Sequence, residues 1–202
     1  MPSGNPPISS LTDPFTSLGS GSHFVTQSLT ANDVATASGG VLTLAPAPAN
    51  GKAGIFVRSA TPWRLDESQV SVNMTQVVSA AGHVNCKFLV AAPGNLWNEQ
   101  VGFWYESGWL YLFAVTGGIE TDYATVPYSA TSHAWLRIRE SGTAFYWETS
   151  SDGTSWTTLA TAPDSVAKIP LDGVTLDFDA REFGTSGNAT PGMATFTGLN
   201  AR

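Results

Sequence analysis

Short runs of alternating apolar and polar residues, separated by Gly, Pro, Asn and Ser, constrain the fold of this chain most strongly. Helical periodicity, with apolar residues three or four positions apart, is nearly absent. The runs that predict strands are residues 40–45, 54–58, 69–77, 84–91, 100–106, 109–115, 122–126, 134–140, 144–150, 156–160, 174–178 and 194–199. So many short strands indicate an all-β protein, and a two-sheet sandwich rather than a small barrel.

Length and charge limit the number of domains and the class of partner. A chain of 202 residues with 42% hydrophobic and 12% charged residues fits one domain around one core. The net charge is −7 and Lys and Arg together number only 9, so the chain offers no basic surface to neutralise phosphates. We therefore expect no nucleic-acid partner.

The first residues differ from the rest of the chain. Residues 1–12 contain three prolines and no periodic pattern, which predicts an extended N-terminal arm followed by a single sandwich domain over 13–202. No stretch approaches the roughly 18 apolar residues of a membrane helix, and the N-terminus lacks a basic and apolar leader. We expect synthesis in the cytoplasm of the producing cell and no membrane insertion. The lone Cys86 is expected to be a small buried apolar residue.

Two hairpins can be registered from the sequence, because Glu-Ser-Gly occurs twice between strand-like runs. A turn at Ser107-Gly108 pairs Glu106 with Trp109 and Trp104 with Tyr111. Alternation then places one apolar set on the core face: Val101, Phe103, Tyr105, Leu110, Leu112 and Ala114. The opposite face carries Trp104, Glu106, Trp109, Tyr111 and Phe113.

The second hairpin gives a similar separation. A turn at Ser141-Gly142 pairs Ile138 with Phe145 and Leu136 with Trp147, and these four residues are expected in the core. The other face carries Trp135, Arg137, Arg139, Tyr146 and Glu148. Burying two arginines between sheets without partners would cost several kcal/mol, so this face is expected to point outward.

The segment from His133 to Thr161 resembles the concanavalin A-like lectin/glucanase superfamily, particularly laminin-G-like domains in minor tail proteins of phages that infect actinobacteria. The resemblance rests on Trp-Leu-Arg-Ile-Arg at 135–139 followed by Ser-x-Asp-Gly-x-x-Trp at 150–156. Further similarity lies in Asp-Pro-Phe at 13–15, Gly-Gly-Val-Leu-Thr-Leu at 39–44 and Ala-Thr-Phe-Thr-Gly-Leu at 194–199. It implies an antiparallel two-sheet jelly roll whose sheet surface holds saccharide.

The carboxylates of the chain bear on whether it could hydrolyse sugars or bind a metal ion. The Glu-x-Asp-x-Glu pattern of the superfamily's glycosidases is absent, and the nearest approach is Asp177-Phe178-Asp179, with Glu182 beyond it. We therefore expect no enzyme activity. The same aspartates, with Asn188, leave a bound calcium as a minor possibility, and otherwise no cofactor is expected. The three histidines His23, His83 and His133 lie far apart, which predicts no metal site.

Sugar sites combine ring platforms with carboxylate, amide or guanidinium groups. Seven residues of the two hairpins offer that combination: Trp104, Trp109, Tyr111, Trp135, Arg137, Tyr146 and Glu148. Trp63 and Trp97, in loops flanked by Pro, Gly and Asn, are expected to be exposed on a contact surface.

With the resemblance, these residues predict a non-catalytic carbohydrate-binding virion protein. It would be a phage minor tail or tail-tip protein that recognises a bacterial cell-envelope glycan. Its expected partners are that glycan, other virion subunits and further copies of itself in a homo-oligomer such as a trimer. The alternatives are a structural virion decoration without sugar binding and a glycoside hydrolase.

Overall fold

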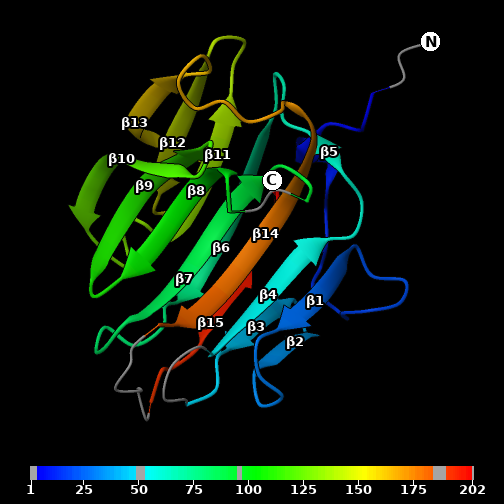
Figure 1. Cartoon of the computed structure of the whole chain (residues 1–202), viewed down its shortest axis with the longest axis vertical. Helices are drawn as coiled ribbons and strands as arrows, with labels where there is room; N and C mark the ends of the chain where they lie inside the picture. The colour runs from blue at the N-terminus through cyan, green and yellow to red at the C-terminus, as the bar shows by residue number, and fades with distance from the viewer. Residues whose placement is uncertain (1–3, 49–52, 95–96, 184–189, 202) are drawn as a thin grey trace.

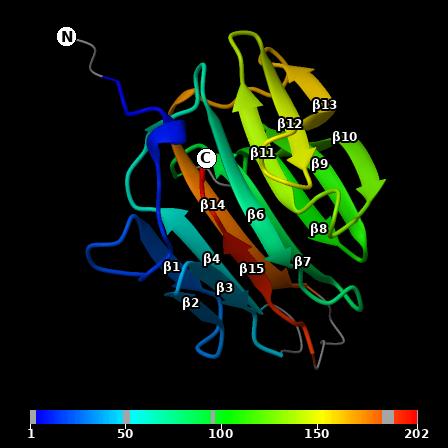
Figure 2. The same cartoon turned by 180° about the vertical axis from the view of Figure 1, so that it is seen from behind.

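The computed structural model describes residues 4–48, 53–94, 97–183 and 190–201, which form a sandwich of two antiparallel sheets (Figures 1 and 2). The first sheet has the order β1 (Phe24–Ser28), β4 (Ala53–Ser59), β14 (Asp172–Glu182), β7 (Val84–Ala91), β8 (Glu99–Glu106), β9 (Trp109–Thr116) and β10 (Ile119–Pro127), and β5 (Trp63–Arg64) pairs with β14. The second sheet has the order β13 (Thr157–Pro163), β12 (Ala144–Ser150), β11 (Trp135–Glu140), β6 (Gln69–Gln76), β15 (Ala194–Thr197), β3 (Val41–Ala45) and β2 (Val34–Ser38). The all-β, two-sheet prediction is confirmed.

All twelve predicted strands are present, and three further strands escaped prediction. β1 and β2 are edge strands: most side chains of β1 face solvent, and β2 turns only two alanines, Ala35 and Ala37, toward the core, so neither shows a strong alternation of apolar and polar residues. β5 is only two residues long. The alternation of apolar and polar residues that predicts a strand arises where one face of the strand is buried. These three segments bury too little apolar surface to show it clearly.

The core lies between the two sheets. Both predicted apolar sets are buried there, including Phe103, Leu112, Leu136 and Ile138, each at most 1% exposed. Trp147 also lies in the core, and its Nε1 donates a hydrogen bond of 2.8 Å to the carbonyl of Gly102 in the opposite sheet. The one polar atom of this buried ring therefore has a partner. Cys86 is buried as expected, and burial raises the pKa of its thiol to about 12.

The register of the first hairpin is confirmed. Glu106 opposes Trp109 and Trp104 opposes Tyr111, and both turn residues, Ser107 and Gly108, have positive φ. Two central residues of positive φ define the type I′ turn, whose twist matches that of the flanking strands.

The predicted register of the second hairpin is wrong by two residues. Ile138 opposes Trp147 rather than Phe145, because the turn is centred on Gly142-Thr143 instead of Ser141-Gly142. Gly142 supplies the positive φ at the first central position. Since side chains alternate with a period of two, a shift of two residues leaves every side chain on its predicted face.

The predicted arm lies partly against the sandwich. Ile8, in the short 3₁₀ helix η1 (Ile8–Ser10), and Leu11 are fully buried in the core. The Asn200 amide donates hydrogen bonds of 2.9 and 2.8 Å to their two carbonyl oxygens. The N-terminal segment is thus hydrogen-bonded to the residues that follow β15. The domain boundary after residue 12 stays a prediction.

Within the parts of the chain that the structure describes, no helix has the length and apolar character required to cross a membrane.

Candidate functional site

The seven residues predicted to form one sugar-binding surface lie on two opposite faces of the sandwich. Trp104, Trp109 and Tyr111 belong to β8 and β9 of the first sheet, and they alternate with buried core residues. Trp135, Arg137, Tyr146 and Glu148 belong to β11 and β12 of the second sheet. Because the core separates the outer faces, the two groups cannot contact the same sugar ring.

On the second sheet, the polar groups are bonded to one another. The Glu148 carboxylate accepts hydrogen bonds from Arg137 Nε at 2.7 Å and from Arg139 Nε and Nη2 at 3.1 and 3.0 Å. Burial by itself would raise the pKa of Glu148, but the hydrogen bonds from Arg139 and Arg137 outweigh it and hold the pKa below its ordinary value. The guanidinium groups also stack, Arg137 on Trp156 and Arg139 on Tyr146.

Trp135 is also packed within the chain. A Cβ atom on Gly153 would lie 2.8 Å from its ring, and one on Gly198 would lie 2.7 Å from it. Both glycines allow the backbone to approach the indole closely. The rings and charges of this face therefore already have intramolecular partners.

The outer face of the first sheet contains a cavity of about 340 Å³, here called the Lys87 cavity. Its walls include three rings and three buried polar side chains: Trp97, Trp104, Phe183, Asn85, Lys87 and Arg181. They come from β7, β8, the neighbouring strand β14 and the loops that flank these strands (Figure 1). Trp97 is 59% exposed, as predicted, whereas the same prediction for Trp63 is wrong, because Trp63 lies in β5 and packs into the core at 7% exposure.

Lys87 and Arg181 each contact aromatic rings in this cavity. Lys87 Nζ lies 4.5 and 4.6 Å from the ring centres of Trp104 and Phe113. The Arg181 guanidinium lies 4.8 and 4.9 Å from the rings of Trp97 and Phe183, and its Nη2 pairs with Asp179 at 3.0 Å. Burial lowers the pKa of Lys87 to about 8.

Several polar atoms of the cavity have no hydrogen-bond partner among the described residues. They are the donors Trp104 Nε1 and Arg181 Nε and the acceptor Asn85 Oδ1. A buried polar atom without a partner costs about 1–3 kcal/mol, so such atoms are rare unless a ligand or water completes them. This distinguishes the Lys87 cavity from the bonded network on the second sheet.

Asp177 and Asp179 lie on the same outer face, beside the cavity. Asp177 accepts hydrogen bonds from Arg58 at 2.5 Å and Thr175 at 2.8 Å. Burial nevertheless raises the pKa of Asp177 to about 6. The two aspartates are two residues apart in β14 and paired in regular register with β7, so they share one face of the sheet.

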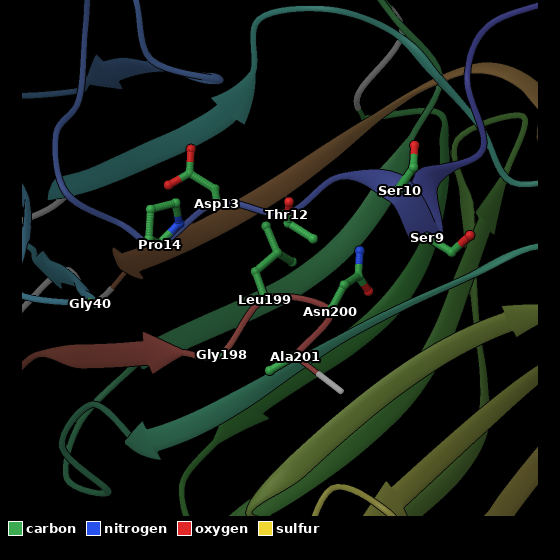
Figure 3. Close-up of a pocket in the computed structure, with 10 residues that line it drawn as sticks. All are labelled: Ser9, Ser10, Thr12, Asp13, Pro14, Gly40, Gly198, Leu199, Asn200 and Ala201. Carbon is green, nitrogen blue, oxygen red and sulfur yellow. The ribbon is translucent and has the colours of Figure 1, made fainter.

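A wider cavity of about 690 Å³ lies between the N-terminal segment and the residues that follow β15 (Figure 3). Its main polar groups are bonded within the chain: Asn200 Oδ1 accepts from Ser71 N at 2.9 Å, and Asp13 Oδ1 accepts from Phe15 N at 2.6 Å. It lacks the rings of the Lys87 cavity, and its buried charge, Asp13, already accepts a hydrogen bond within the chain, so it is the weaker candidate.

Trp104 and Trp97 of the cavity were predicted as contact residues from the sequence, whereas Lys87, Arg181 and Asn85 were not. The sequence contained one indication of this site. Lys87 lies in the middle of the apolar run Val84–Ala91, and a lysine in a buried strand is rare unless it has a partner or a function. Arg181 lies beyond the predicted end of its strand at residue 178, so its face was not assigned.

No family model matches the chain, and no curated protein does. Among solved structures it is similar to a glycoside hydrolase family 16 endo-glucanase from Bacteroides ovatus, at 9% identity over 96% of both chains with a TM-score of 0.61. The fold is the concanavalin A-like lectin/glucanase jelly roll. The VIP36 exoplasmic/lumenal domain, solved with Ca²⁺, shares 12% identity over 93% of this chain and 89% of that one, with a TM-score of 0.57. The carbohydrate-binding module CBM66 from Bacillus subtilis shares 12% identity over 86% and 92%, with a TM-score of 0.52.

These structures correct one expectation. The prediction that the chain is not an enzyme is overturned, because several of the similar structures are glucanases, including an endo-1,3-beta-glucanase from Thermotoga petrophila. The absence of one sequence motif therefore does not exclude hydrolysis in this fold. At 7–9% identity the likeness shows the fold and does not establish catalysis.

The expectation about metals stays a prediction. VIP36 was solved with Ca²⁺, whereas the described ranges of this chain contain no group of three or more His, Cys, Asp or Glu that could hold a metal ion. Asp177 and Asp179 are held by Arg58 and Arg181 instead. Asn188, the suggested calcium ligand, lies outside the described residues.

Proposed function

We propose that this protein binds carbohydrate at the Lys87 cavity, and that it is a phage minor tail or tail-tip protein that recognises a bacterial cell-envelope glycan. One observation carries the site: rings and buried polar atoms without partners occur together in the Lys87 cavity. Rings match the apolar C–H faces of sugars, and free donors and acceptors match their hydroxyl groups.

Two further findings support the proposal. The similar structures include VIP36 bound to mannose-containing ligands and a carbohydrate-binding module, which shows that this fold can present saccharide sites. The virion role rests on the resemblance of residues 133–161 to phage tail proteins. In that setting we expect several copies per particle, packed with other virion subunits, because an open site binds weakly and needs multivalency.

Glycan-array binding tests the proposal. The purified protein is expected to bind one class of envelope polysaccharide from actinobacteria, and Trp104→Ala is expected to weaken this binding at least ten-fold, because it removes both a ring and a free donor. The thermal midpoint of the variant serves as the folding control. Oligomer or capsid assembly without any glycan binding would instead indicate a structural virion protein.

Hydrolysis of the bound glycan is the second candidate function. Asp177, whose raised pKa of about 6 suits a general acid, lies two residues from Asp179 on the same face. If the chain is a hydrolase, reducing ends should appear when it is incubated with its glycan, and Asp177→Asn or Asp179→Asn should abolish them. Binding without release of reducing ends would exclude this function for that glycan.

A further inference from the structure

The Lys87 ammonium is a buried cation without a counter-ion. Lys87 is 6% exposed, and no carboxylate among the described residues forms an ion pair with it. Asp179 stands directly opposite on β14, where its Oδ2 pairs with Arg181 and its Oδ1 is buried without a hydrogen-bond partner among the described residues. Contacts with two rings offset only part of the cost of burying a charge.

The buried groups of the cavity carry one excess positive charge. Lys87 and Arg181 are cationic and Asp179 is the one anion, and each is at most 6% exposed. Three more carboxylates face Lys87, namely Glu106 on β8 and Glu120 and Asp122 on β10, and Glu106 and Glu120 also line the cavity. Glu120 and Asp122 are exposed and Glu106 is half-buried, so solvent screens their effect on the buried cation.

Two N–H donors without hydrogen-bond partners belong to residues near this charge. Trp104, opposite Lys87 on β8, has an unpartnered Nε1, and Arg181 has an unpartnered Nε. The residues that carry these donors, Lys87, Trp104 and Arg181, all line the same cavity. N–H donors with a net positive charge match a carboxylate oxygen pair better than neutral hydroxyl groups.

Resting on the proposed function, we infer that the Lys87 cavity recognises an acidic saccharide, one whose sugar carries a carboxylate that pairs with Lys87. The rings of Trp97 and Trp104 contact the sugar, and Asn85 Oδ1 accepts from one of its hydroxyl groups. Lys87 is thereby the residue that distinguishes acidic from neutral sugars.

The test compares matched monosaccharides in NMR titrations: glucuronate against glucose, and galacturonate against galactose, with acetate as a carboxylate without a sugar. Each uronate is expected to bind at least ten-fold more tightly than its neutral counterpart and than acetate. Lys87→Met should remove the preference, whereas Lys168→Met, at an exposed lysine, should leave it unchanged.

The wild-type protein gives an independent readout. The charged form of Lys87 is lost as the pH rises through about 8, so uronate affinity should fall about ten-fold between pH 7 and pH 9 while neutral-sugar affinity stays constant. Equal binding of acidic and neutral sugars would overturn this inference and leave the proposed function intact. Acetate binding as tight as that of the uronates would also overturn it, and binding of no sugar at all would refute the proposed function itself.

Discussion

Single charged side chains in this protein have very different environments. Glu148 is surrounded by two guanidinium groups and one hydroxyl, and Asp152 by backbone donors, so both carboxylates are satisfied within the chain. Lys87 is buried to a similar degree as Glu148 but lacks a counter-ion among the described residues. At the scale of residues, this contrast locates the candidate site. A charge with hydrogen-bond partners inside the chain needs no ligand, whereas a buried charge without a counter-ion is a candidate to bind one.

Lys87→Met is expected to stabilise the free protein. The folded-state pKa of Lys87 is depressed to about 8, so between pH 8 and 10.5 the unfolded chain binds more protons and stability rises with pH. Removing the buried charge should raise the free energy of unfolding at pH 7 by about 1–3 kcal/mol and abolish this rise. Urea unfolding at several pH values measures both effects. A destabilised variant with an unchanged pH profile would show that Lys87 is not a buried, unpaired cation.

Asp152 supports the turn between β12 and β13. Its Oδ1 accepts hydrogen bonds from the backbone N–H groups of Ser155 and Thr154 at 2.7 and 2.8 Å, and these hold its pKa well below the ordinary value. This contribution is present above about pH 4 and is lost as the pH falls further, because the depressed pKa lies in the folded state. Asp152→Ala should lower the thermal midpoint at pH 7, and Asp152→Asn, which keeps an acceptor oxygen, should lower it less. Equal midpoints for all three proteins would contradict this role.

At the scale of elements, the sequence predicts strands and faces better than registers. Tight turns fix the register only when their central residues are identified, and Ser107-Gly108 was identified correctly whereas Gly142-Thr143 was not. The register error in the second hairpin was two residues, an even number, so Leu136 and Ile138 are buried as predicted. Edge strand β1 was missed because most of its side chains are exposed on both faces, and β2 because its inward-facing residues, Ala35 and Ala37, are small and only weakly apolar.

Core burial of β11 can be measured directly. Leu136→Ala or Ile138→Ala should each lower the free energy of unfolding by about 2–5 kcal/mol, because each leaves a cavity between the sheets. Thr157→Ala, at an exposed position of β13, should change it by less than about 0.5 kcal/mol. Chemical denaturation of the three variants gives the comparison. Losses under about 0.5 kcal/mol at both β11 positions would mean that the faces of this strand are inverted.

At the scale of the whole molecule, the arrangement of the two sheets decides which residues can act together. Each hairpin could be built from the sequence, but the sheet to which it belongs depends on pairings between strands far apart in the chain, such as β14 with β7 and β11 with β6. For this reason the predicted surface was divided between opposite faces. The Lys87 cavity could not be assembled from sequence, because it needs β14 beside β7, whose residues lie far apart in the chain.

The central claim is that the ligand binds at the Lys87 cavity on the outer face of the first sheet. Isothermal titration of a glycan identified on the array, against Trp97→Ala and Trp109→Ala, tests it most directly. Both rings are exposed, at 59% and 44%, so neither change should unfold the protein, but only Trp97 lies in the cavity wall. Trp97→Ala is expected to weaken binding at least ten-fold, a loss of about 1.4 kcal/mol, with Trp109→Ala unchanged. Undiminished binding by Trp97→Ala, together with loss of binding by Trp135→Ala on the opposite sheet, would contradict the account.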